Sequence, residues 1–286
     1  MNRKNAFFVF QVAAVMLLLV ISYALPAAAQ SPASEQSKSA QPKDSENEDL
    51  INPDRPGIAD GSMVIGAKRL QIETGIQAEY RHQNESSEYT LFFPTLLRIG
   101  ISDRWEARIE GNTFTWKSDF DDTTNHASGL APLSLGFKYH IADSGGASHP
   151  SMGAIVRVFP AWGTSDFRTQ HVTGDLRLVA DWDFAHKLSL NPNVGVGVYE
   201  DDQGKVFVAG LFALTLNYLP SKNLNPFIDF GLQVPEEKNG DTSVILDAGV
   251  AYIVGRNVQL DVSAGTGVNG QTPPHPFISL GVSLRF

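Results

Sequence analysis

The sequence of 286 residues contains no cysteine, and this absence excludes disulfide frameworks, thiol catalysis and cysteine-based metal sites. It also excludes a lipid-modified N-terminal cysteine. Basic residues are in deficit, with 22 Lys and Arg against 31 Asp and Glu and no basic block, so nucleic acid is not an expected partner. No run of about eighteen or more apolar residues follows the N-terminus, which argues against a helical membrane protein.

The first 29 residues have the features of a cleavable signal peptide. Arg3 and Lys4 provide a positive start, Val12–Ile21 is uninterrupted and apolar, and Ala27–Ala29 supplies the small residues that a signal peptidase requires. We therefore expect export into a Gram-negative bacterial envelope and a mature chain beginning at Gln30, with an uncleaved anchor as the alternative. Cleavage removes two of the basic residues, which leaves 20 against 31 acidic ones and a formal charge of −11.

The segment after the signal peptide has a composition typical of disorder. Residues 30–53 are rich in Ser, Glu, Gln, Lys and Pro and have almost no large apolar side chain, so burial cannot offset the entropy of ordering them. We predict that residues 30–67 form a flexible periplasmic segment ahead of a single domain over residues 68–286. A tail that binds a partner is the alternative to a plain linker.

The chain ends in a strand with one apolar and one polar face. In Phe277–Phe286 every second residue from Ile278 is apolar, and the residues between are small or polar. Because alternate side chains of a strand point to opposite faces, this pattern fits a wall with lipid on one side and water on the other. The terminal aromatic, Phe286, is the expected signal for the barrel assembly machinery.

The same alternation recurs about twelve times and predicts an all-β protein: a transmembrane, antiparallel, up-and-down β-barrel of about twelve strands. The expected strands begin at Lys68, Tyr89, Trp105 and Leu133 and then run over Met152–Trp162, Val172–Phe184, Leu188–Tyr199, Val206–Leu219, Pro226–Val234, Val244–Val254, Val258–Gly267 and Phe277–Phe286. A soluble sandwich is disfavoured, because the apolar faces are too numerous for one core.

Connections of two kinds alternate along the chain. Longer polar loops are expected near Gln83–Glu88, Lys117–Gly129, Gly163–His171, Asp201–Lys205, Pro235–Asp241 and Val268–Pro276, and most of the connections between them are shorter. Such barrels have short periplasmic turns and longer outer loops, with both termini in the periplasm. The loops over Lys117–Gly129 and Val268–Pro276 are candidates to gate entry.

The inward face of this barrel is predicted to be heavily charged. The candidate lumen-lining residues are Glu73, Glu79, Arg81, Arg98, Glu106, Arg108, Glu110, Lys138, Arg157, Asp175, Arg177, Asp181, Asp229, Asp247, Asp261 and Arg285. Buried charges must be paired or hydrated. The set is therefore either a ladder of ion pairs that plugs the lumen or the lining of a water-filled path, and the sequence does not decide between them.

Catalytic chemistry has little support. His126 and Ser128 lie two residues apart, so a strand would place them on one face, as in some outer-membrane lipid hydrolases. No carboxylate or amide can be assigned to orient the histidine, and the seven histidines show no metal spacing. We expect a non-enzyme without cofactor or metal, whose partners are outer-membrane lipid, the assembly machinery and a small solute.

Several short stretches carry a family resemblance through their order along the chain. They are Asp54-Arg55-Pro56, Leu70 to Gly75, Ser128-Gly129-Leu130, Leu133 to Tyr139, Phe159-Pro160, Asn193-Val194-Gly195, Leu260-Asp261 and Leu284-Arg285-Phe286. Over residues 52–286 the chain resembles the outer-membrane family described as meta-pathway phenol-degradation proteins or transporters. The resemblance implies an outer-membrane barrel linked to aromatic compounds and supplies no catalytic residues. Ala131-Pro132 and Ala161-Trp162 depart from the family pattern at strand ends.

Three functions follow, in this order. The first is a channel or transporter in the outer membrane for small solutes, aromatic compounds among them. The second is a closed structural or interaction barrel whose lumen is locked by ion pairs. The third is a lipid hydrolase that uses His126 and Ser128.

Overall fold

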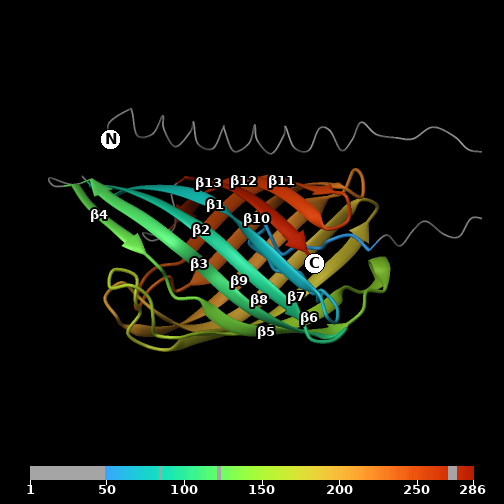
Figure 1. The fold of residues 1–286 in the computed structure, drawn as a ribbon, viewed down its shortest axis with the longest axis horizontal. Coiled ribbons are helices and arrows are strands. Elements are labelled where there is room, and N and C mark those ends of the chain that lie inside the picture. The colour runs from blue at the N-terminus through green and yellow to red at the C-terminus, as the bar shows by residue number, and fades with distance from the viewer. Residues whose placement is uncertain (1–48, 84–85, 121–123, 270–275) are drawn as a thin grey trace, which may run out of the picture. The chain divides into compact units, whose positions relative to one another are not determined.

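The computed structural model of the chain describes residues 49–83, 86–120, 124–269 and 276–286; the predicted signal peptide and residues 30–48 lie outside these ranges. The described residues are mainly strands (Figure 1). The strands are β1 (Leu70–Gln83), β2 (Ser86–Gly100), β3 (Trp105–Phe120), β4 (Thr124–Gly129), β5 (Ser134–Ala142), β6 (Ser151–Phe159), β7 (Thr173–Ala185), β8 (Leu188–Glu200), β9 (Val206–Tyr218), β10 (Leu224–Val234), β11 (Ser243–Val254), β12 (Val258–Asn269) and β13 (Phe277–Arg285).

The strands form one antiparallel sheet that closes on itself. Neighbours in sequence pair from β5 round to β13, β13 pairs with β1, and β1 and β3 both pair with β2. β4 and β5 both pair with β3, at Thr115–Phe120 and at Trp105–Glu110 respectively, so they share one position in the ring. The barrel therefore has 12 strand positions, and the predicted fold class is confirmed.

The two ends of the barrel differ, and we call them the turn end and the loop end. The turn end holds the short connections at residues 101–104, 186–187, 219–223 and 255–257 and one longer connection at residues 143–150. It also holds Phe286, whose N–H donates to Leu70 O. The loop end holds the connections at residues 160–172, 201–205 and 235–242. The first strand, β1, thus begins at the turn end, and the last strand, β13, ends there.

The interruption between β4 and β5 was not predicted. We expected a polar loop over Lys117–Gly129, but β3 continues to Phe120 and β4 pairs with it. The hairpin carries polar side chains, as in the hydrogen bond of 2.9 Å between Ser118 Oγ and His126 Nδ1, so hydrophobic alternation could not reveal it. Pro132, which has no N–H to donate to a ladder, lies in the gap between β4 and β5.

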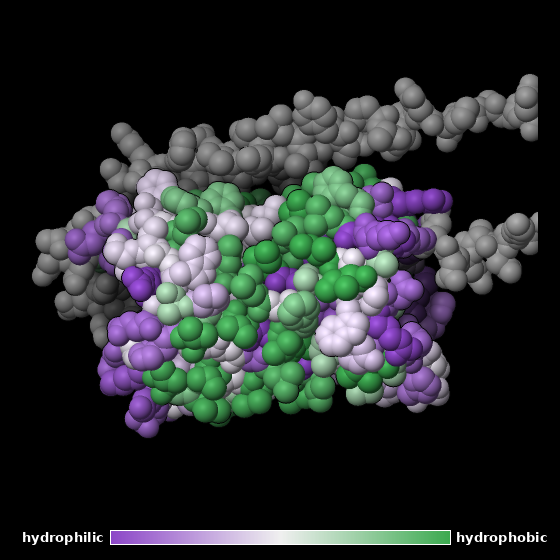
Figure 2. All heavy atoms as spheres, turned by 60° about the horizontal axis from the view of Figure 1, so that its bottom comes forward, coloured by the Kyte–Doolittle hydropathy of each residue, from purple (hydrophilic) through white to green (hydrophobic). Residues whose placement is uncertain are grey.

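Outward side chains form the apolar surface that a membrane barrel requires. Exposed apolar residues alternate along the strands, for example Val194 and Val196 on β8, and Figure 2 shows a hydrophobic band between two hydrophilic ends. Near the turn end, the rings of Trp105 and Tyr139 pack with centroids 4.5 Å apart. Within the described ranges, no helix combines the length and the apolar character needed to cross a membrane.

Residues 50–67 differ from our prediction of a flexible periplasmic segment. The chain in this range runs along the inside of the barrel, and Ile51 and Ile65 are 2% and 6% exposed. Composition missed this arrangement because wall side chains hold the segment through polar contacts, described below, and the segment needs no apolar core of its own. We call residues 50–67 the inserted segment.

Candidate functional site: an inserted segment in the barrel lumen

The inserted segment enters and leaves the barrel at the turn end. Ile51 N–H donates to Arg256 O at 2.8 Å, and Lys68 N–H donates to Gly100 O at 3.0 Å. Between these anchors the sequence contains two prolines and three glycines, which favour neither a helix nor a strand. The backbone of the segment must therefore find hydrogen-bond partners elsewhere, and the barrel wall supplies them.

Wall side chains accept hydrogen bonds from the backbone along the whole segment. The donors and acceptors are Asp54 N and Arg55 N to Glu73 Oε2 (2.9 Å each), Ile58 N to Asp229 Oδ2 (3.0 Å), Asp60 N to Asn193 Oδ1 (2.8 Å), Ser62 N to Asp181 Oδ2 (2.8 Å) and Ile65 N to Glu106 Oε2 (3.0 Å). Every acceptor except Asn193 is a carboxylate that the sequence predicted to face the lumen. These acids bind the segment.

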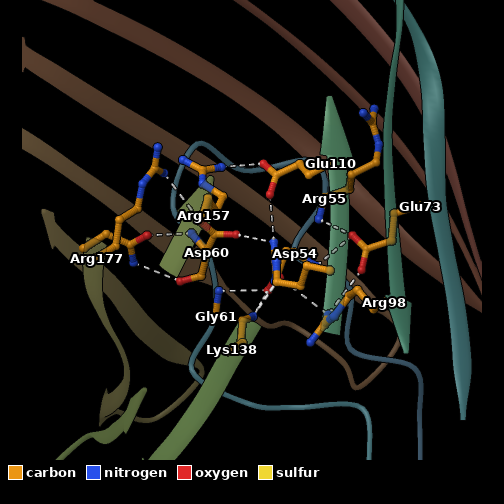
Figure 3. A network of polar contacts seen from close by, with 12 residues as sticks. Asp54, Arg55, Asp60, Gly61, Glu73, Arg98, Glu110, Lys138, Arg157 and Arg177 are labelled. Atoms are coloured by element: carbon orange, nitrogen blue, oxygen red, sulfur yellow. Dashed lines mark hydrogen bonds and ion pairs between the residues drawn. The ribbon is translucent and has the colours of Figure 1, made fainter. Parts of the chain in front are cut away.

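Asp54 of the segment joins cations from three wall strands. Its Oδ2 lies 2.7 Å from Lys138 Nζ on β5, pairs with Arg108 on β3, and lies 3.6 Å from Arg98 Nη1 on β2. Arg98 in turn pairs with Glu106 at 2.8 Å. These side chains are almost completely buried, and Figure 3 shows Lys138 and Arg98 beside Asp54. Since an isolated buried charge is costly, each of these groups depends on the others.

Asp60 fixes the far part of the segment to a second group of wall residues. Its Oδ1 accepts a hydrogen bond of 2.9 Å from Arg108 Nη2, and its Oδ2 lies 3.5 Å from Arg177 Nη1 on β7. Its backbone carbonyl accepts a hydrogen bond of 2.9 Å from Asn193 Nδ2 on β8. Arg108 therefore holds the segment at both Asp54 and Asp60.

Nearer the loop end, wall charges pair with one another. Arg157 forms two hydrogen bonds with Asp175, at 3.0 and 2.6 Å, and a third with Glu110 at 2.7 Å. Tyr199 Oη donates to the same Asp175 at 2.8 Å. Figure 3 places Arg157 and Arg177 beside Asp60, and ion pairs run without a break from Glu73 to Asp175.

The opposite side of the lumen lacks cations of its own. β8 to β12 contain no Lys or Arg. Arg55 of the segment reaches this side and pairs with Asp261 at 3.0 Å. Asp229 and Asp247 face each other in register on β10 and β11, and both are buried. Small or neutral side chains fill most other inward positions here, which leaves space inside the barrel.

This space includes two cavities. The larger, about 410 Å³, is lined by Gly57, Ala59 and Gly61 of the segment and by polar wall residues. The wall residues include Ser151, Asp181, Asn191, Thr215, Asn217 and Asn225. The smaller, about 180 Å³, is lined by Ile58 and by wall residues that include Arg177, Asn193, Leu211, Ala213, Gln233 and Ile245.

The tip of the inserted segment separates the two cavities. Along β9, Thr215 lines the larger cavity and Ala213, the next inward residue, lines the smaller, so the cavities follow one another along the barrel. The contact from Ile58 N to Asp229 and the paired contacts between Asp60 and Asn193 form the partition.

Comparison with known proteins defines the family. Residues 53–286 match the family described as "Putative MetA-pathway of phenol degradation". The chain belongs to this family. No curated protein matches the chain.

The phenol-degradation family fold also occurs among solved structures. An outer membrane channel from Pseudomonas putida F1 superposes with a TM-score of 0.60 at 12% identity, over 82% of this chain and 100% of that one. The β domain of the Bordetella autotransporter BrkA gives a TM-score of 0.50 at 14% identity, over 76% of this chain and 98% of that one. At these identities the likeness concerns the barrel fold.

The structure brings most of the sequence-predicted lumen residues into one network and leaves others at the rims. Glu79 and Arg81 lie near the loop end of β1. Arg285 lies at the turn end, where its Nη1 donates to Leu50 O at 3.1 Å. A pore-lining role for any of these residues stays a prediction, as does the assembly role of Phe286.

Sequence reasoning missed the residues of the inserted segment. Asp54 and Arg55 stood in the motif that carried the family resemblance, and Asp60 follows closely, yet composition placed all three in a flexible segment. The sequence signal that could have revealed this segment is the charged motif Asp54-Arg55-Pro56, which lies in a stretch rich in Pro and Gly directly before the first strand. His126 bonds to Ser118 and has no described bond to Ser128. Among the described residues, no three His, Asp or Glu side chains are arranged to hold a metal ion.

Proposed function

We propose that this protein is an outer-membrane channel for small solutes, aromatic compounds among them, and that the inserted segment closes it at rest. Membership of the phenol-degradation family supports this function, as does the fold shared with the Pseudomonas protein that is named an outer membrane channel. The observation that carries the proposal is the pair of cavities that follow one another along the barrel and are divided by residues 57–60.

The proposed orientation follows from the connections. Barrels of this kind have short turns in the periplasm and longer loops outside, so the turn end faces the periplasm and the inserted segment enters from there. The signal peptide predicted over residues 1–29 would deliver the chain to the outer membrane. A solute would then enter at the loop end and meet the smaller cavity before the larger one.

The segment suits a gate because its attachments are polar and non-covalent. Water that enters with a solute can replace such contacts, whereas a packed apolar plug would expose apolar surface to that water. A plug that never moves would make the barrel a structural element, which is the second candidate. A lipid hydrolase has no observation in its favour, and we propose a role in transport rather than catalysis.

A reversible disulfide tests whether the segment moves. A Cβ atom placed on Gly57 would lie 3.2 Å from Thr215 Oγ1, a spacing that suits a disulfide between Cys residues at these positions. The chain has no other cysteine, so Gly57→Cys with Thr215→Cys forms a single defined bond. Single-channel conductance in a planar bilayer, recorded with excess phenol as the probe solute, should be near zero in the oxidised protein and should return after reduction.

Two controls make this result decisive. Each single cysteine variant should behave like the unmodified protein with and without reductant. A conductance that is equal in the oxidised and reduced double variant would show that solutes do not pass the tip. A silent barrel in both states, with intact resistance to heat, would favour the structural barrel instead.

A further inference from the structure

The smaller cavity, on the loop side of residues 57–60, has the size of a binding site for one ring. Its volume is about 180 Å³. An apolar protein cavity of about 150 Å³ is large enough to hold benzene. A six-membered ring with one small substituent therefore fits.

The walls of this cavity are largely apolar on the cation-free side. Ile58 of the segment, Leu211 and Ala213 of β9 and Ile245 of β11 line it. Polar groups come from Gln233, Ser243 and the amide of Asn193, which already bonds to Asp60 in both directions. The body of a ligand that fits these walls is apolar.

Arg177 is the one charged residue among those that line the smaller cavity. Its contacts are long, 3.5 Å to Asp60 and 3.4 Å to Asp175, and its buried Nε has no hydrogen-bond partner. Arg157, one β-strand away, instead has contacts of 2.6 to 3.0 Å to Asp175 and Glu110. Arg177 is thus a partly buried cation beside an apolar space, with its side chain 19% exposed and its Nε without a partner.

We propose that the smaller cavity binds a small monocarboxylate whose apolar body is about one ring in size, with its carboxylate on the Arg177 guanidinium. A guanidinium and a carboxylate form short parallel hydrogen bonds, which the long contacts to Asp60 and Asp175 do not provide. The ring lies against Leu211 and Ile245. The inference rests on the proposed function, because the ligand is a solute that the channel carries.

Calorimetric titration of the purified barrel in detergent tests the proposal with benzoate, benzyl alcohol and acetate as probes. Benzoate should bind saturably, and the other two at least tenfold more weakly, because benzyl alcohol lacks the charge and acetate lacks the ring. Arg177→Gln should weaken benzoate binding at least tenfold and leave benzyl alcohol unchanged. Benzoate binding that survives Arg177→Gln, or acetate binding as tight as that of benzoate, would overturn the assignment.

Two further variants separate this site from general effects. Arg168→Gln removes the same charge from an exposed loop residue and should bind benzoate like the unmodified protein. Ile245→Phe fills the cavity and should weaken both benzoate and benzyl alcohol. The titration measures binding and not passage through the barrel. Absent benzoate binding would overturn this inference and leave the conductance result intact. Absent conductance would overturn the proposed function and leave benzoate binding intact.

Discussion

The two sides of the barrel interior are built from different residues. One side, which we call the cationic wall, comprises β2, β3 and β5 to β7 and presents Arg98, Arg108, Lys138, Arg157 and Arg177. The other, the cation-free wall, comprises β8 to β12 and has no Lys or Arg. The cationic wall holds Asp54 and Asp60 of the inserted segment, whereas the cation-free wall contributes most of the strand residues around both cavities.

The cationic wall fixes the inserted segment in place, and the cation-free wall leaves space inside the same lumen. Short ion pairs between buried groups fix the position of the inserted segment, because leaving any one of them unpaired is costly. Small and neutral side chains on the other side leave volume that a solute can use. A ring of charges spread evenly around the barrel would either fill the lumen or leave charges unpaired, so the asymmetry allows a closed but not solid interior.

The largest expected effect comes from removing a cation from the cationic wall. Arg98→Leu leaves Glu73, Glu106 and Asp54 without a shared partner. We expect the free energy of unfolding to fall by about 3–5 kcal/mol. Urea titration of the refolded barrel, followed by tryptophan fluorescence, measures the change. Lys205→Ala in an exposed loop is the control and should stay within about 0.5 kcal/mol; an equally small change for Arg98→Leu would contradict the comparison.

Matched carboxylates sharpen the contrast between the walls. Asp175→Asn removes the charge that pairs with Arg157 and should cost about 1.5–3 kcal/mol of unfolding free energy. Asp229→Asn should change it by about 0.5 kcal/mol or less, because an amide oxygen still accepts the Ile58 N–H and no cation loses its partner. The same urea titration compares the two, and equal losses would show that the walls do not differ in this respect.

The smallest effect is expected at the rim, where water replaces buried partners. Lys117 and Glu88 form an ion pair of 2.7 Å, and the lysine side chain is 36% exposed. Lys117→Gln should alter the unfolding free energy by about 0.5 kcal/mol or less, since exposed pairs contribute little. A loss above about 1 kcal/mol in the urea titration would mean that the cationic wall extends to the rim.

The sequence predicts the structure well only where a part of the chain follows a regular hydrophobic pattern. The alternation in segments such as Phe277–Phe286 reports the two faces of a wall directly, so fold class and strand positions were predictable. The pairing of β4 with the end of β3 was missed because the polar residues of these two strands follow no hydrophobic period. The predicted lumen residues Arg98 and Arg108 do face inward, but inward alternation says nothing about what fills the lumen.

The role of Asp54 and Asp60 was beyond the sequence for a related reason. Their partners, Arg108 and Lys138, lie 48 to 84 residues away along the chain. The inserted segment is held by side chains of distant strands. Its own sequence therefore shows no hydrophobic periodicity that would predict an ordered structure. The contrast between the walls could nevertheless be predicted from the sequence, because β8 to β12 contain no Lys or Arg.

The inserted segment is tethered to the barrel that it fills. Its tip at Gly57 precedes β1 at Leu70 by 13 residues, and an extended chain spans at most about 3.6 Å per residue. Once displaced, the tip stays within reach of Arg108 at an effective concentration on the order of millimolar. A solute therefore competes with the tip of the inserted segment, which acts as an intramolecular ligand. Under the proposed function, the channel recloses at a rate independent of protein concentration. Solutes that bind weakly open it only at high concentration.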